Sequence, residues 1–104
     1  MKTGKTPALE IDALQLKKAA LHLRAINHPL RQQMIHLLHK FGRLMVTTIY
    51  VKLRIEQSVA SQHLAVLRRA KLVRAERDGK KIYYEVNYQN LERIQNLASE
   101  LVNP

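Results

Sequence analysis

Apolar residues recur at helical spacing in four stretches of the chain and alternate with polar residues in a fifth. The helical spacing predicts helices over about 9–26, 29–40, 57–70 and 88–102. Asn27, His28 and Pro29 separate the first two, because the residue before a proline disfavours helix and proline suits a first helical turn. Gly42 favours the end of the second helix. The buried stripe expected on that helix is Leu30, Met34, Leu37, Leu38 and Phe41.

Residues 44–51 fit two local structures. The run is rich in β-branched and aromatic residues, which favours a strand. Thr47 could instead cap a short helix that carries Ile49, Tyr50 and Leu53. The residues alone leave open a strand, a helix, or a short strand at 44–46 followed by a helix at 47–54.

Residues 72–87 predict a β-hairpin. Asp78-Gly79 is a strong signal for a two-residue turn in which both central residues take positive φ. Ile82, Tyr84 and Val86 alternate with polar or exposed positions, so one face of the second strand is expected to point inward. Arg77, Lys80 and Lys81 lie around the tip.

Length and composition narrow the class of protein. The chain has 104 residues, enough for one domain with a modest core, and 46% of them are apolar. It contains no cysteine, which excludes disulfides and thiolate metal sites. No apolar run is long enough to cross a membrane, and residues 1–12 lack the apolar region of a signal peptide, so a cytoplasmic protein is expected.

Positive charge is concentrated in the middle of the chain. The whole chain carries +10, with 18 Lys and Arg against 8 Asp and Glu. Residues 13–91 hold fifteen of these cations and only four acids, a local charge of +11. So basic a segment makes nucleic acid the leading partner, ahead of an anionic membrane surface.

Two short helices joined by a tight turn and followed by a basic hairpin are typical of a winged helix-turn-helix. The predicted fold class is mainly α (α+β), with about five helices and a β-hairpin wing. One domain is expected over 9–103, with the helix-turn-helix at about 47–70, the wing at about 72–87 and a flexible tail at 1–8. The second helix of the pair would enter the major groove of double-stranded DNA.

Four stretches in order resemble the ArsR/SmtB-type bacterial transcriptional repressors, over about residues 14–100. They are Ala25-Ile26-Asn27-His28-Pro29-Leu30-Arg31, Ser58-Val59-Ala60-Ser61-Gln62-His63-Leu64-Ala65-Val66-Leu67, Ala70-Lys71-Leu72-Val73 and Gly79-Lys80-Lys81-Ile82-Tyr83-Tyr84. The resemblance implies a short strand followed by a helix across the ambiguous stretch near residue 47. It also implies a homodimeric repressor, paired through its first and last helices, that binds an inverted-repeat operator.

The side chains expected to contact DNA come from the predicted recognition helix and the wing. Gln62 can bond an adenine edge with both amide atoms, and Ser58 and Ser61 are short enough to let the helix approach. His63 lies just off the exposed stripe, where a backbone contact and a partly buried structural role are equally open. The wing cations would supply affinity with little sequence information. The full set is Gln57, Ser58, Ser61, Gln62, His63, Arg68, Arg69, Arg77, Lys80 and Lys81.

The dimer is expected to form through the helices at about 9–26 and 88–102. Both have wide apolar stripes, and a chain of this size has too little core to cover both. The residues expected at the interface are Leu9, Ala13, Leu16, Ala20, Leu91, Ile94, Leu97, Ala98 and Leu101.

The metal sites of the resembled family do not carry over to this chain. Its cysteine-bearing segment corresponds to Met45-Val46-Thr47, and its last-helix ligands correspond to positions that include Tyr88, Asn90, Leu101 and Pro104. His36 and His39 are three residues apart on one helix, which is half of a metal site at best. No metal and no cofactor are therefore expected, and any effector ligand is unidentified.

Three other functions compete with specific repression. A nucleoid-type winged-helix protein would bind DNA with weak sequence preference. A winged-helix protein-interaction module would not need the three clustered wing cations. An enzyme is not expected, because the chain has no glycine-rich phosphate loop, no paired carboxylates in an apolar setting and no nucleophile with a matching base.

Overall fold

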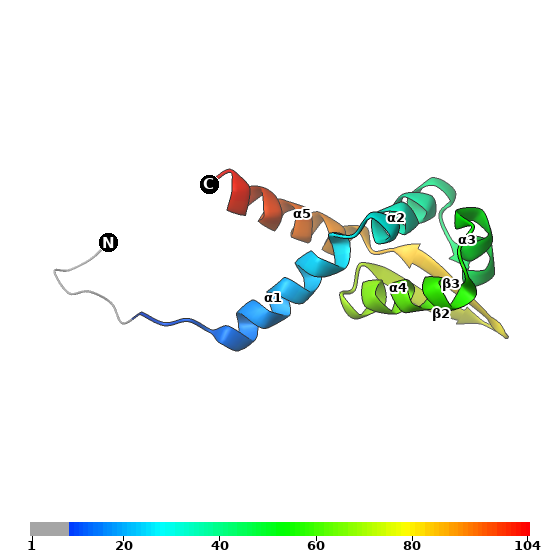
Figure 1. Ribbon diagram of the computed structural model, residues 1–104, viewed down its shortest axis with the longest axis horizontal. Coiled ribbons are helices and arrows are strands. Elements are labelled where there is room, and N and C mark those ends of the chain that lie inside the picture. Colours follow the sequence, from blue (N-terminus) through cyan, green and yellow to red (C-terminus); the bar gives the residue numbers. More distant parts are fainter. Residues whose placement is uncertain (1–8) are drawn as a thin grey trace.

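The computed structural model describes residues 9–104, so the flexible tail predicted over 1–8 lies outside the described residues. Within that range the chain forms five α-helices and a three-stranded antiparallel sheet (Figure 1). This arrangement confirms the mainly α winged helix-turn-helix predicted from the sequence. The order of elements is helix, helix, strand, helix, helix, strand, strand, helix.

The first helix, α1 (Ala13–Ile26), begins four residues later than predicted. The backbone of Asp12 is extended, and its side-chain Oδ1 accepts a hydrogen bond of 3.0 Å from the Gln15 N–H. Such a cap satisfies a free N–H of the first turn and fixes where the helix starts. Leu9 and Ile11 follow the helical spacing but precede the cap, and they are exposed. The predicted start at residue 9 is therefore wrong.

The second helix, α2 (Pro29–Phe41), begins where the proline signal placed it. His28 is extended, and its Nδ1 accepts a hydrogen bond of 3.1 Å from the Leu30 N–H. Gly42 follows the helix with φ +84°, a conformation that glycine adopts without steric cost.

The buried stripe of α2 differs from the prediction at two positions. Phe41 is 47% exposed, and its ring lies against the Lys52 and Lys40 ammonium groups, 4.4 and 5.4 Å from the ring centroid. Ile35, which the prediction left out, is buried. Phe41 is exposed because it occupies the last helical position, where the chain turns away at Gly42.

The ambiguous stretch forms both structures in succession: β1 (Leu44–Met45) and then α3 (Val46–Leu53). This is the order that the resemblance implied. Met45 holds the N-cap position of α3 without a side-chain cap bond, so the capping role considered for Thr47 is wrong. A three-residue turn, in which Arg54 has φ +56°, leads into α4 (Gln57–Arg69).

The wing consists of β2 (Val73–Asp78) and β3 (Lys81–Val86), and the strand order is β1-β3-β2. Asp78 pairs with Lys81, so the two loop residues are Gly79 and Lys80, and only Gly79 has positive φ, at +65°. The prediction that Asp78 and Gly79 would both take positive φ is wrong. Glycine at the first loop position is the pattern of a type II′ turn, which suits the twist of paired strands.

The last helix, α5 (Tyr88–Val102), and α1 extend away from the core and diverge from each other, at the left of Figure 1. On the other side of the molecule, α2, α3 and α4 pack with the sheet, and the tip of the wing projects past α3 and α4 (Figure 1). The largest fully buried side chains, all in or beside these elements, are Met34, Leu38, Ile49, Leu64, Leu67 and Leu72.

Candidate nucleic-acid interface

One face of α4 anchors the helix, and the opposite face is open to solvent. Ala60, Leu64 and Leu67 are completely buried, and their i, i+4, i+7 spacing places them on one side of the helix. The side chains on the other face are all exposed: Gln57, Ser58, Ser61, Gln62, Ala65 and Arg69. Apart from its arginine this surface is uncharged, and it consists of short or amide side chains that can donate and accept hydrogen bonds.

The N-terminus of α4 carries no side-chain cap. Glu56 holds the N-cap position, but its carboxylate makes no cap hydrogen bond. The backbone N–H groups of the first turn therefore remain free to bond an anion, and the helix dipole favours negative charge there. Gln57, the first residue of the helix, lies beside these groups and is exposed.

His63 lies apart from the other predicted contacts of α4. Its side chain is partly buried, and its Nδ1 lies 3.1 Å from a guanidinium nitrogen of Arg31 on α2. The His28 ring is also close, with 4.7 Å between the two centroids. Burial lowers the pKa of the His63 imidazole, and the charges of His28 and Arg31 lower it further. The structure thus places His63 against α2, in the partly buried position that the sequence left open.

Basic side chains lie at the C-terminal end of α4 and at the tip of the wing. Arg68 and Arg69 form the last turn of the helix, where a positive charge also interacts favourably with the helix dipole. Arg77, Lys80 and Lys81 lie at the tip of the wing, and all three are exposed. Within residues 9–104 one salt bridge is found, at 3.8 Å between Arg43 and Glu76, which lies midway along β2. The cations of the wing tip and of the α4 C-terminus are therefore not neutralised by ion pairs within this range.

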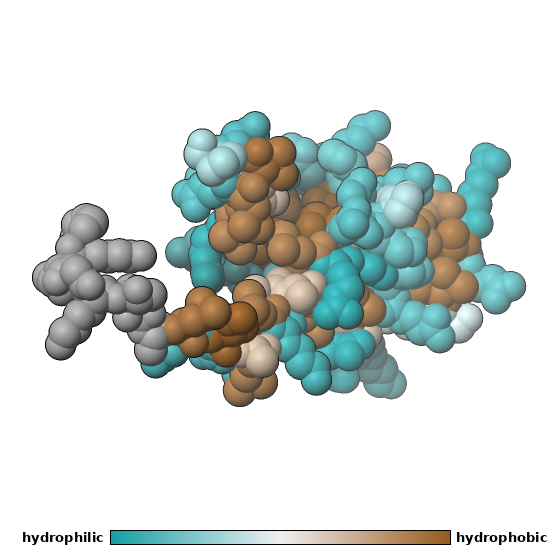
Figure 2. Space-filling model, turned by 60° about the vertical axis from the view of Figure 1, so that its left-hand side comes forward, coloured by the Kyte–Doolittle hydropathy of each residue, from teal (hydrophilic) through white to brown (hydrophobic). Residues whose placement is uncertain are grey.

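Apolar side chains cover the arms formed by α1 and α5. Figure 2 looks toward the open ends of these helices and shows apolar surface on both. Leu16 is 60% exposed and Leu101 is 65% exposed, although both are large and apolar. Leu14 and Leu21 widen the apolar stripe of α1, and Val102 ends α5. All three are exposed, although the predicted interface set did not include them.

Not all of the predicted interface residues share this exposure. Ala13 and Leu97 are exposed, and Ala20, Leu91 and Ala98 are partly buried. Ile94 is buried in the core of the single chain, because it faces inward near the start of the arm.

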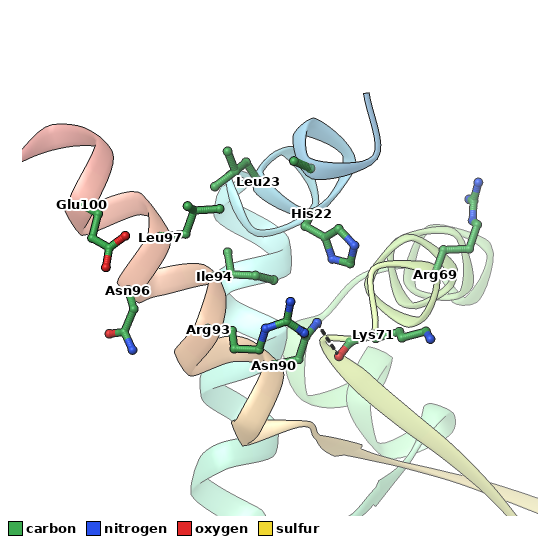
Figure 3. A pocket seen from close by; sticks show the side chains of 11 residues that line it. His22, Leu23, Arg69, Lys71, Asn90, Arg93, Ile94, Asn96, Leu97 and Glu100 are labelled. Carbon is green, nitrogen blue, oxygen red and sulfur yellow. Dashed lines mark hydrogen bonds between the residues drawn. The ribbon is translucent and has the colours of Figure 1, made fainter. Parts of the chain in front are cut away.

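A cleft of about 590 Å³ separates α1 from α5 near the end of α4 (Figure 3). Leu23 and Leu97 lie close together above Ile94, and Arg93 lies beside Asn90 (Figure 3). The side-chain amide of Asn90 donates to the Ala70 and Lys71 carbonyl oxygens, at 2.9 and 3.1 Å. His22 Nδ1 lies 2.9 Å from the same Ala70 oxygen. These bonds tie both arms to the C-terminal end of α4.

The structure adds no ligand cluster to the two histidines of α2. His36 and His39 are exposed, and His39 Nδ1 lies 2.8 Å from the Tyr88 hydroxyl. Residues 9–104 contain no group of three or more His, Cys, Asp or Glu arranged to hold a metal ion. None of the helices described is long and apolar enough to cross a membrane.

Known proteins resemble this chain in both sequence and structure. No protein-family model matches it. The transcriptional repressor PagR of Bacillus anthracis is 35% identical over 95 residues, which cover 91% of this chain and 91% of PagR. The crystal structure of NolR from Sinorhizobium fredii superposes with a TM-score of 0.72 at 30% identity, covering 93% of this chain and 96% of NolR.

A third protein shares the fold at lower identity. Mb0332 from Mycobacterium bovis is a homodimeric winged helix-turn-helix DNA-binding domain and a possible ArsR-family transcriptional regulator. Its solution structure has a TM-score of 0.73 at 24% identity, covering 95% of this chain and 91% of that one. The repressor relative, the shared fold and the four sequence stretches agree: the chain belongs to the ArsR/SmtB-type family of winged helix-turn-helix transcriptional regulators.

Proposed function

We propose that this protein is a homodimeric repressor that binds an inverted-repeat operator in double-stranded DNA. In this proposal, α4 enters the major groove and the wing contacts the flanking backbone or minor groove. The exposed residues of α4 read bases, with Gln62 bonding an adenine edge. Arg68, Arg69, Arg77, Lys80 and Lys81 contact phosphates, and so position the protein without reading sequence.

The observation that carries the proposal is the pairing of two different surfaces. The open face of α4 is polar and nearly uncharged, which suits the reading of base edges. Cations that lack ion-pair partners within residues 9–104 lie at its C-terminal end and on the wing. A protein-interaction module has no need for this combination, whereas a DNA-binding protein uses the first surface for specificity and the second for affinity.

Dimerisation is supported by the apolar arms. Contiguous exposed apolar surface on a small protein marks an interaction site. The apolar surfaces of α1 and α5 flank the cleft between them, so a second copy could cover both arms in one interface. A two-fold dimer would present its recognition helices about one DNA turn apart, roughly 34 Å, to two half-sites.

The remaining parts of the proposal follow from this function. A regulator of this class would work in the cytoplasm, together with the DNA that it controls. It needs no metal or cofactor to bind its operator. Release from DNA would depend on an unidentified effector ligand or on a partner protein.

Selection of bound sequences from a random duplex library at physiological salt tests the proposal. Enrichment of an inverted repeat with half-sites about one turn apart is the expected result. Retention of duplexes without enrichment would instead indicate a nucleoid-type DNA binder. No retention at all would contradict DNA binding and favour a protein-interaction module.

A further inference from the structure

Arg31 joins three helices through one side chain. It lies in the first turn of α2, and its Nε donates to the Ala25 carbonyl oxygen at 2.6 Å. Its Nη2 donates to the Arg24 carbonyl oxygen at 2.9 Å, so two bonds hold the C-terminal end of α1. Its Nη1 lies 3.1 Å from Nδ1 of His63 on α4. We call this set of contacts the Arg31 junction.

The chemistry of arginine fixes the protonation state of His63 in this junction. A guanidinium donates hydrogen bonds and accepts none. His63 Nδ1 must therefore be the acceptor, which places the ring proton on Nε2 and leaves the imidazole neutral. Protonation of His63 would place an N–H on Nδ1, facing the Arg31 guanidinium. The hydrogen bond from Arg31 and a charged His63 ring therefore exclude each other.

We propose that Arg31 is a positioning residue, which fixes the recognition helix relative to the dimerisation helix α1 through neutral His63. This inference rests on the proposed function, because it requires α4 to be the helix that reads DNA. In a dimer, α1 would set the spacing of the two halves, and the junction would pass that spacing to α4. His63 thus contributes to DNA recognition without touching DNA.

The charges around His63 make the junction sensitive to acid. The charged or titratable groups that face its ring are His28, from the α1–α2 connection, and Arg31 from α2. Both oppose a positive charge on the ring, as does burial, and together they keep the pKa of His63 below its usual range. No carboxylate contributes to this shift within residues 9–104. The contact is therefore intact at neutral pH and is lost as His63 takes up a proton.

The first test uses the free, full-length protein and needs no DNA. Long-range ¹⁵N–¹H NMR correlations of the histidine rings report both the tautomer and the titration of each imidazole. The expected result is the Nε2–H tautomer for His63 and a midpoint below the ordinary value of about 6.5. Replacing Arg31 by Gln should raise that midpoint. A proton on Nδ1 at neutral pH, or a midpoint at or above the ordinary value, would overturn the junction.

The second test measures the ratio of operator affinity to random-duplex affinity from pH 7.5 to 5.5. For the wild type, we expect this ratio to fall about tenfold as the pH falls. His63→Asn places an amide oxygen near the position of Nδ1 and cannot titrate, so its ratio should stay constant. His36→Asn removes an exposed histidine of α2 away from the junction and should behave as the wild type does.

Arg31→Lys completes the set of variants. Lysine keeps the positive charge, but a single ammonium group cannot make the same planar set of bonds. For this variant, the ratio of operator affinity to random-duplex affinity should already be about tenfold below the wild-type ratio at pH 7.5. It should then change little as the pH falls. An equal fall for the wild type and His63→Asn would overturn the positioning role. No operator preference in the wild type at pH 7.5 would instead contradict the proposed function, while the tautomer would still decide whether the contact exists.

Discussion

Adjacent residues of α4 have different surroundings because each residue turns the helix by about 100°. Gln62 faces solvent, whereas His63 turns toward α2 and meets Arg31. The exposure of Gln62 could be predicted from periodicity alone. The partner of His63 could not, because Arg31 lies 32 positions earlier and only the folded chain brings the two together.

Replacing Gln62 by Ala should weaken operator binding by about 1–3 kcal/mol, because one bidentate base contact is lost. Binding to random duplexes should change much less. Fluorescence anisotropy titrations with both kinds of duplex measure the two effects. Gln89→Ala, an exposed glutamine at the start of α5, is the matched control. Equal losses on the two duplexes would contradict base readout by Gln62.

Acid should destabilise the wild-type fold through His63. Its folded pKa is depressed, chiefly by burial, so the unfolded state binds the proton first as pH falls. The stability contributed by neutral His63 is fully present above about 6.5, its unfolded value, and declines as pH falls toward the folded pKa.

Denaturant unfolding of the wild type and His63→Asn between pH 7.5 and 5 checks this prediction. On acidification, the unfolding free energy of the wild type should fall more than that of His63→Asn. A difference independent of pH would show that His63 titrates alike in both states.

At the scale of elements, the pattern of apolar residues predicts which helices exist better than where each begins. The periodicity located α2, α4 and α5 to within one residue at each end. It misplaced the start of α1, because one hydrogen bond from Asp12 sets that boundary. It also missed the turn geometry of the wing, where strand register places Gly79 and Lys80, instead of Asp78 and Gly79, in the loop.

The wing should control the salt dependence of DNA binding. Replacing Lys80 and Lys81 by Gln should flatten the slope of log affinity against log salt by up to about two units, since each phosphate contact releases a counterion. Lys17 and Lys18 are exposed on α1, and the same replacement there removes equal charge far from the wing. Similar slopes for the two double variants would mean that total charge, and not wing contact, sets the salt dependence.

At the scale of the molecule, the apolar arms are the feature that a single chain leaves unexplained. The sequence predicted two apolar stripes, but it could not show how much of each the chain itself would cover. The structure divides them: Ile94 is buried within the chain, whereas Leu101 is 65% exposed. That division depends on the divergence of α1 and α5, which is a property of the whole fold.

Leu101→Glu should weaken the dimer by at least about tenfold, because burying an unpaired carboxylate in an apolar interface is costly. Analytical ultracentrifugation over a range of protein concentrations measures the change. Val51 on α3 is also 65% exposed and apolar, so Val51→Glu is a control matched in exposure and chemistry. Dissociation constants that shift equally in both variants would argue against pairing through α5.

Within residues 9–104, the cations on the wing and at the end of α4 have no ion-pair partners, and this has a consequence for how such a regulator finds its site. A surface that attracts phosphate regardless of sequence holds the protein loosely on any stretch of duplex and lets it slide and hop along it. The chromosome offers millions of such stretches for each operator. Most copies would therefore already be on DNA before the operator is reached. Regulation would then redistribute bound molecules along the chromosome instead of recruiting free ones.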